Sequence, residues 1–450
     1  MASKNLLSPI GNGCYLSIMA FLKKIWVIAF LLFACLAVDS DQFSMDGPGL
    51  FSPRYAVADS IKSGARERPK PFDHIFLTWA GNPATSQAVT WRSFVESSKP
   101  MAEIATATSS TGFAGKASQI PAVTSSLKIN NQSVYYHSVN FTDLKPNTLY
   151  AYRVGNGDIW SEWFQFRTAG TDAEPFSFLY LADAQNEISS LWSRTIRAAI
   201  LHSPGIRFMI HTGDMVDPKN SPHEWNEWFN AGSWVFASIP SLPATGNHEY
   251  KIYRGQGREL SKFWRPQFTL PENDIPVLAE TYYHLDYQGA RFVVLNSNRK
   301  IEKQARWLEK VLGDNPHRWT IVTLHHPVYS SVRGRDNKLV REQWSPLFNK
   351  FNVDLVLQGH DHVYTRGYAP GKSGGPVYVT SVSGPKMYKL ARREWMARAG
   401  EGLQLFQVIS IDGDVLNFTS VTVTGEVYDA FDLIKKDGNA GELINKPHLR

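Results

Sequence analysis

Cysteine is almost absent from this chain of 450 residues. Its two cysteines, Cys14 and Cys35, both lie near the N-terminus. Without a thiol after residue 35, the body of the protein has no disulfide framework and no thiolate nucleophiles or ligands. A metal site in this part of the chain therefore has to use histidine, carboxylate or amide side chains.

A large charge excess is also lacking. The formal net charge is +6, and three of the basic residues, Lys4, Lys23 and Lys24, lie in the first 38 residues, which carry no acidic residue. The rest of the chain is nearly balanced, which argues against a nucleic-acid partner. With 43% hydrophobic and 20% charged residues, the composition is that of a globular protein, and the length predicts two or three domains.

Long apolar runs are missing as well, so we expect no transmembrane span. The run from Ile25 to Ala37 has 13 mostly apolar residues after two lysines, which is too short for a span and typical of a signal peptide. We therefore expect residues 1–38 to be a signal peptide, and the protein to be secreted, periplasmic or at the cell surface. A second interpretation is a lipoprotein signal with a lipid anchor on Cys35, and a third is a buried helix.

The remaining chain divides into segments with different patterns. Residues 39–70 are polar and predict an arm or linker. Residues 71–170 contain short alternating runs separated by turn residues, which predict an antiparallel β sandwich. In residues 171–435, strands alternate with helices, which predicts an α/β domain with a largely parallel core. Residues 436–450 are polar and predict a C-terminal tail.

Five short polar segments each follow a predicted strand of the α/β domain, at the strand ends where such domains place their sites. They are Asp183-Ala-Gln185, Gly213-Asp214-Met-Val-Asp217, Gly246-Asn247-His248-Glu249, His325-His326-Pro327 and Gly359-His360-Asp361-His362. Carboxylate, amide and imidazole ligands in combination suit Fe, Zn or Mn. Six such ligands are enough for two metal ions, a pair that suits in-line displacement at phosphorus.

In this order, the five segments resemble the calcineurin-like metallophosphoesterases. Together with the upstream sandwich, they resemble the plant-type purple acid phosphatases. Four further segments support this, namely Pro83–Trp91, Leu144–Gly155, Trp160–Thr168 and Tyr378–Tyr388. The resemblance covers residues 70–432. It implies a fibronectin-type-III-like domain at residues 71–170, followed by a four-layer α/β/β/α metallophosphoesterase domain at residues 171–435.

The resemblance also implies a role for each site residue. The metal ligands would be Asp183 and His362 for the first metal, Asn247, His325 and His360 for the second, and Asp214 as the bridge. His248 would face the leaving group as a general acid, or would stabilise the transition state. The implied reaction is acid phosphatase-like hydrolysis of a small phosphate monoester by a metal-bridging hydroxide, with two divalent or trivalent transition metals (Fe, Zn or Mn) as cofactors.

Two positions depart from the purple acid phosphatase pattern. Asp217 stands where that family has the tyrosine whose phenolate on ferric iron gives the colour. We expect Asp217 to orient His248, as the matching carboxylate does in phosphoprotein phosphatases; a helix cap is the other interpretation. Gln185 stands where the family has glycine and many relatives have histidine. It either ligates a metal through its amide oxygen or, as we favour, hydrogen-bonds a metal-bound water.

Several further assignments stay open at this point. Substrate contact and simple packing are equally compatible with His326. We expect His211 to be a packed core residue, and Arg366 and Lys386 to be solvated at the surface; contact with an anion is the other interpretation for these two cations. The alternative functions are a phosphodiesterase or nucleotide hydrolase on the same site, and a non-catalytic surface binding protein with a degenerate metal site.

Overall fold

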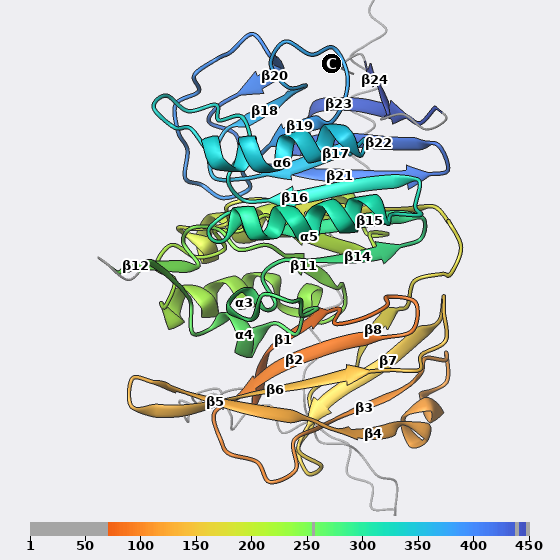
Figure 1. The fold of residues 1–450 in the computed structure, drawn as a ribbon. Helices are drawn as coiled ribbons and strands as arrows, with labels where there is room; N and C mark the ends of the chain where they lie inside the picture. The colour runs from red at the N-terminus through yellow and green to blue at the C-terminus, as the bar shows by residue number, and fades with distance from the viewer. Residues whose placement is uncertain (1–70, 254–256, 437–440, 447–450) are drawn as a thin grey trace, which may run out of the picture. The chain divides into compact units, whose positions relative to one another are not determined.

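The computed structural model describes residues 71–253, 257–436 and 441–446. The expected signal peptide, the alternative lipid anchor at Cys35 and nearly all of the expected arm lie outside these residues. Within them, an N-terminal β-rich domain is followed by an α/β domain, which agrees with the predicted fold class (Figure 1).

The N-terminal domain consists of two antiparallel four-stranded sheets. The first sheet has the order β1 (Phe72–Thr78), β2 (Gln87–Ser93), β6 (Gln132–Phe141) and β5 (Val123–Ile129). The second has the order β4 (Ser118–Pro121), β3 (Met101–Thr106), β7 (Leu149–Gly155) and β8 (Phe164–Arg167), with the short 3₁₀ helix η1 (Thr111–Lys116) after β3. Side chains of both sheets, including Val89, Trp91 and Tyr152, form one buried cluster between them. The domain is therefore a β sandwich.

The α/β domain is built on two seven-stranded sheets. The order of the first is β11 (Ser241–Pro243), β10 (Phe208–His211), β9 (Phe176–Leu181), β21 (Leu405–Asp412), β22 (Val415–Thr422), β23 (Val427–Ile434) and β24 (Glu442–Asn445). The order of the second is β14 (Tyr283–Tyr287), β15 (Ala290–Leu295), β16 (Trp319–Leu324), β17 (Leu355–Gln358), β19 (Val377–Thr380), β18 (Tyr364–Gly367) and β20 (Met396–Gly400). The hairpin of β12 (Tyr250–Tyr253) and β13 (Gly257–Leu260) stands apart from both sheets.

Helices cover the outer faces of the two sheets. On the first sheet, the π-helical turn η2 (Ile188–Trp192) leads into α2 (Ser193–His202), which packs on β21 and on α3 (Pro222–Phe236). On the second, α5 (Ile301–Gly313) and α6 (Lys338–Lys350) lie side by side (Figure 1). The short helices α4 (Trp264–Gln267) and η3 (Pro276–Leu278) lie in the connection between β13 and β14. This is the α/β/β/α layering that the sequence predicted.

Local sequence explains the central strands and the helices against them. All six residues of β15 and of β16 are buried, as expected for parallel strands that are covered on both faces. The apolar residues of α5 recur on one face of the helix, where Leu308 and Val311 join the core beneath it. On the inner side, the ring centroids of Phe178 and Phe292 lie 5.2 Å apart, so the two sheets share one aromatic core.

The sandwich and the α/β domain pack closely on each other. Phe76 of β1 lies among the rings of the α/β domain, with its centroid 5.0 Å from that of Phe236 and 5.1 Å from that of Phe268. The Tyr152 hydroxyl donates a hydrogen bond of 2.6 Å to the carbonyl of Ala237. The domain boundary is therefore a continuous apolar interface and not a flexible junction.

The C-terminal part of the chain differs from expectation. Residues 442–445 are not a frayed tail but form β24, which pairs with β23 along its length. The N–H of Gly441 donates to the buried carboxylate of Asp354, which anchors this strand to the second sheet. A polar composition alone did not reveal that the backbone there completes a sheet edge.

In the part of the chain that the structure describes, no helix is both long and apolar enough to cross a membrane.

Candidate metal centre

The five predicted segments meet at the carboxyl ends of strands from both sheets. Asp183 and Asp214 follow β9 and β10, and Asn247 follows β11. His325 directly follows β16, and His360 lies just beyond the end of β17. The strand pairings bring these ends together although 179 residues separate Asp183 from His362 in the sequence.

One cluster forms around His325. Its Nε2 lies 3.0 Å from Asn247 Oδ1, 3.2 Å from His360 Nδ1 and 3.2 Å from Asp214 Oδ2. The Nδ1–H of His325 donates to the carbonyl of Thr212 at 2.9 Å, which leaves the lone pair of Nε2 facing the cluster. Acceptor atoms therefore face one another at short distances, and a cation between them would satisfy all of them.

A second cluster consists of Asp183, Asp214 and His362, whose ligand atoms all lie within 4.8 Å of one another. His362 Nδ1 donates to the carbonyl of Lys386 at 2.8 Å, so its Nε2 lone pair points at the carboxylates, 3.4 Å from Asp183 Oδ1. Asp214 belongs to both clusters. The residues present thus fit two metal ions that share one carboxylate.

The electrostatics of the clusters also favour bound cations. Burial raises the pKa of Asp183 well above its usual value, because two desolvated carboxylates lie close together. Burial lowers the pKa of His325, but the neighbouring Asp214 and Asp183 carboxylates outweigh this and raise it to about 9. Both shifts favour extra protons among the buried carboxylates, and a bound cation would offset the same negative charge.

Backbone strain is concentrated at the same residues. Four of the six predicted ligands have left-handed backbones, namely Asp183, Asp214, His360 and His362, with φ of 51°, 49°, 71° and 48°. Such a conformation costs about 1–3 kcal/mol for a residue other than glycine and persists mainly at functional sites. A Cβ on Gly213 would collide with the backbone of Gly246, so these two glycines allow the strand-end loops that hold Asp214 and Asn247 to approach each other.

Comparison with known proteins finds a family match for each of the two domains. The family profile for the N-terminal domain of purple acid phosphatases matches residues 72–168, and that for the calcineurin-like phosphoesterases matches residues 176–364. Together these matches support a metallophosphoesterase that is similar to the purple acid phosphatases. Its domain organisation is that of the purple acid phosphatases.

Individual relatives of this phosphoesterase are distant. The chain is 29% identical over 256 residues to Fe(3+)-Zn(2+) purple acid phosphatase 12 of Arabidopsis thaliana, covering 53% of each protein. It is 25% identical over 344 residues to an uncharacterized protein of Mycobacterium tuberculosis, covering 67% of this chain and 63% of that protein. It thus spans less than two thirds of the length of these curated relatives.

Among solved structures, the purple acid phosphatase PPD1 from yellow lupin seeds has a similar fold. Its TM-score is 0.71 at 18% sequence identity, and the match covers 82% of this chain and 76% of the lupin chain. The PhoD structure matches with a TM-score of 0.64 at 12% identity, covering 86% of this chain and 94% of that one. At these identities the similarity concerns the fold alone.

In this phosphoesterase, Gln185 lies between the predicted ligands of the first metal. Its Nε2 lies 3.0 Å from Asp214 Oδ2 and 3.1 Å from His362 Nε2, and it donates to both. Its Oε1 accepts from Lys386 Nζ at 3.4 Å. Since the ammonium group can only donate, the amide oxygen faces Lys386 and the NH₂ group faces the ligands. In this orientation Gln185 presents its amide nitrogen to the predicted ligands, and the hydrogen bond to a metal-bound water that we favoured over direct ligation stays a prediction.

His248 and Asp217 lie beside each other at the edge of the centre. His248 Nδ1 lies 2.6 Å from Asp217 Oδ1 and 2.7 Å from the carbonyl oxygen of the same residue. Both partners accept the Nδ1 proton, so Nε2 points toward the metals, 3.9 Å from Asp214 Oδ2. Asn186 donates from its amide to the second Asp217 oxygen at 3.0 Å. This is the arrangement expected if Asp217 orients His248.

His326 is buried beside the second cluster. Its Nδ1 lies 2.8 Å from Ser297 Oγ, and its ring centroid lies 4.5 Å from that of His360. His326 also forms a close triad with His325 and His360. A contact with substrate remains a prediction for this residue.

Two expectations about cationic residues were wrong. Arg366 of β18, in the second sheet, is buried and forms an ion pair with Asp429 of β23, in the first sheet, with 2.6 Å between Nε and Oδ2. Lys386 is only 26% exposed and turns toward Gln185 and Asp217. These partners come from distant segments of the sequence, so the local sequence around the two cations did not reveal them. His211, by contrast, packs in the core as expected, with its centroid 5.3 Å from that of Trp228.

Glu249 is a functional residue whose role the sequence did not reveal, although it ends one of the five segments. Its buried carboxylate accepts hydrogen bonds from the backbone N–H groups of Gly246, Asp214 and Met215 at 2.6–2.9 Å. It thereby joins the loop that follows β10 to the loop that follows β11. Burial, together with the nearby charge of Asp214, raises the pKa of Glu249 to about 7.

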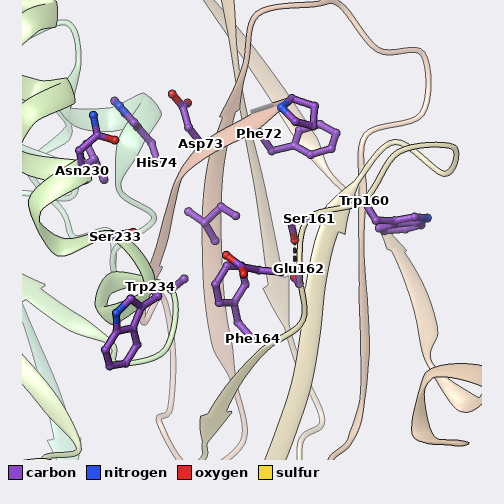
Figure 2. A pocket seen from close by; sticks show the side chains of 14 residues that line it. Phe72, Asp73, His74, Trp160, Ser161, Glu162, Phe164, Asn230, Ser233 and Trp234 are labelled. Atoms are coloured by element: carbon purple, nitrogen blue, oxygen red, sulfur yellow. Dashed lines mark hydrogen bonds between the residues drawn. The ribbon is translucent and has the colours of Figure 1, made fainter. Parts of the chain in front are cut away.

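A separate cavity of about 280 Å³ lies between β1 of the sandwich and α3. Figure 2 shows Phe72, Phe164 and Trp234 around it. None of the predicted metal ligands lines this cavity, so it is not part of the candidate centre.

Proposed function

We propose that this phosphoesterase hydrolyses small phosphate monoesters at a centre of two transition-metal ions. The observation that carries the proposal is the pair of ligand clusters sharing Asp214, with His248 held beside them. The name of the Arabidopsis relative, a Fe(3+)-Zn(2+) purple acid phosphatase, supports iron or zinc as the metals. Bound metals would supply the positive charge that activates a water molecule and neutralises the phosphoryl oxygens.

The residues of the chain would divide this work. Asp183 and His362 would hold the first metal, and Asn247, His325 and His360 the second, with Asp214 between them. His248 would hold a proton on Nε2 and give it to the departing oxygen, because its Nδ1 is engaged by Asp217. Gln185 would donate hydrogen bonds to an oxygen bound at the centre, from the amide nitrogen that faces it.

We further propose that the protein is exported, because its first 38 residues have the basic start and 13-residue apolar run of a signal peptide. The mature N-terminus after expression in a secretion-competent host tests this proposal. Processing near Ala37 would agree with a signal peptide, and a lipid-modified Cys35 with the lipoprotein alternative. An unprocessed cytosolic chain would contradict both.

The proposed activity is tested by measuring metal content and hydrolysis together. We expect the purified full chain to bind about two metal ions and to hydrolyse p-nitrophenyl phosphate. Asp214→Asn removes the charge shared by both metals and should lose at least one of them, with turnover falling to near background. Asp412→Asn, an exposed carboxylate on β21, serves as the control and should change neither.

Two outcomes would overturn the proposal. A wild-type protein that binds metal but hydrolyses neither p-nitrophenyl phosphate nor its bis ester would favour the non-catalytic binding protein. An Asp214→Asn variant with two metals and near-normal turnover would show that Asp214 is not the bridge.

A further inference from the structure

Lys386 brings a positive charge to the side of the centre where this chain departs from the purple acid phosphatase pattern. Its ammonium group donates to Gln185 Oε1 at 3.4 Å and lies 4.0 Å from Asp217 Oδ1. Its own carbonyl accepts the Nδ1 proton of His362. Main chain and side chain of one residue therefore contact a predicted ligand and both atypical residues.

The charge of Lys386 is only weakly neutralised by these contacts. Asp217 is much closer to His248, at 2.6 Å, than to Lys386, at 4.0 Å. In the described part of the chain, the ammonium group makes one hydrogen bond, to a neutral amide, and it has three donors. The remaining donors, on a side chain that is 26% exposed, are available to a ligand.

Two other cations near the centre are already engaged. Arg335 Nη1 donates to the carbonyl of His360 at 2.7 Å and to the buried carboxylate of Asp361 at 3.1 Å. Arg258 donates to Asn298 Oδ1 at 2.8 Å. These partners hold both guanidinium groups at short range, whereas Lys386 has only a long hydrogen bond, an ion pair of 4.0 Å with Asp217 and the ring of Tyr388 at 5.9 Å.

We infer that Lys386 binds a non-bridging phosphate oxygen of the substrate and thereby selects phosphate monoesters over diesters. The inference rests on the proposed function and specifies its substrate class. A monoester carries close to two negative charges at neutral pH, with three terminal oxygens free to accept. A diester carries one charge, and one of those oxygens is esterified, so an additional cation beside the metals stabilises the monoester more.

The alternative is that Lys386 only positions Gln185 and His362. Loss of the side chain would then change metal binding, or would slow hydrolysis of monoesters and diesters alike. A role in phosphate binding instead predicts that phosphate affinity and kcat/KM for the dianionic monoester fall, while kcat/KM for the diester changes little. The two roles are therefore separable by comparing substrates and by measuring phosphate binding without turnover.

The experiment compares four full-length, metal-loaded proteins: wild type, Lys386→Met, Lys386→Arg and Lys389→Met. Lys389 lies in the same loop, is 95% exposed and pairs with Glu401, so its variant controls for loss of a loop charge. For each protein we would measure the metal content and the Kd of inorganic phosphate by calorimetry. The kcat/KM would be measured for p-nitrophenyl phosphate and bis(p-nitrophenyl) phosphate.

We expect Lys386→Met to keep its metals and to lose about 10- to 100-fold in phosphate affinity and in kcat/KM for the monoester. Its kcat/KM for the diester should change by less than about threefold. Lys386→Arg should recover most of the loss because it restores the charge, and Lys389→Met should match wild type.

Four results would overturn the inference: an equal loss on both esters, unchanged phosphate affinity, loss of a metal from Lys386→Met, or no phosphate binding by the wild type. If the wild type hydrolyses neither ester but Lys386→Met still weakens phosphate binding, the proposed activity fails while the anion-binding role of Lys386 stands.

Discussion

At the scale of single residues, Asp217 offers two hydrogen-bond acceptors to the same nitrogen of His248. Both its carboxylate and its main-chain carbonyl face His248 Nδ1. Because the carbonyl alone is sufficient to fix the tautomer, the carboxylate adds a second acceptor for the same proton.

We expect Asp217→Asn to keep both metals and to lower kcat about 10- to 100-fold, because the carbonyl of residue 217 still holds His248. Kinetics and elemental analysis of the same preparation check both points. Loss of a metal from this variant would identify Asp217 as a ligand in its own right.

The visible spectrum tests the replacement of the family's tyrosine by Asp217. A carboxylate cannot give the charge-transfer band of a tyrosinate on ferric iron, so we expect the iron-loaded protein to lack an intense visible band. The ring of Tyr388 lies 4.6 Å from that of His362. A purple protein whose colour disappears in Tyr388→Phe would contradict the expectation and identify Tyr388 as the ligand.

At the scale of elements, the geometry of the centre depends on how strand-end loops are tied together. Strands β9, β10 and β11 are parallel neighbours, so their carboxyl ends present three loops at one edge of the sheet. Glu249 joins two of these loops through three backbone N–H groups. This buried carboxylate therefore positions Asp214 without touching the predicted metals.

Glu249→Gln should weaken the connection between these two loops, because the amide NH₂ group of the glutamine would face backbone N–H donors and could not accept their hydrogen bonds. We expect the free energy of unfolding to fall by about 1–3 kcal/mol and the metal affinity to fall about tenfold. Denaturant unfolding and metal titration measure the two effects. Glu426→Gln, an exposed position, is the control and should change neither. Unchanged metal affinity in Glu249→Gln would show that the loops hold their positions without this carboxylate.

At the scale of the whole molecule, the sandwich shares an interface with the α/β domain through β1. His74 of this strand is buried, stacks on Phe229 at 4.1 Å and donates a hydrogen bond from Nε2 to Asn226 Oδ1 at 3.0 Å. Burial lowers its pKa to about 3, and Arg92 also lowers it, against the opposing effect of Asp73. The folded protein therefore keeps His74 neutral where the unfolded chain protonates it.

This difference predicts acid sensitivity of the domain interface. Below the unfolded pKa of about 6.5 the unfolded state binds the extra proton, so stability falls as the pH drops toward 3. At pH 5, protonation of His74 in the unfolded chain lowers the free energy of unfolding by about 2 kcal/mol. His74→Asn suits the left-handed backbone there, φ 50°, and should reduce the loss of unfolding free energy between pH 7 and pH 5 by about this amount. An identical pH dependence in wild type and variant would contradict the assignment.

The sequence by itself determined the fold class and the types of ligand in the candidate centre. A strand end followed by glycine and a polar residue is a local pattern, since a few neighbouring residues specify both the backbone and the chemistry. Asp214 and Asn247 were recognisable for this reason. The order of such segments then indicated the layered α/β fold, because parallel strands place their carboxyl ends at one edge.

Only the tertiary structure decided which distant residues meet at that edge. Lys386 and Gln185 are 201 positions apart, and β21 joins β9 across more than half of the chain. Such contacts depend on the register of whole sheets and on loop paths that no local pattern encodes. A lysine in a polar loop has the same sequence signature whether it faces water or a buried amide. For that reason the charge that would select the substrate became visible only after the chain was folded.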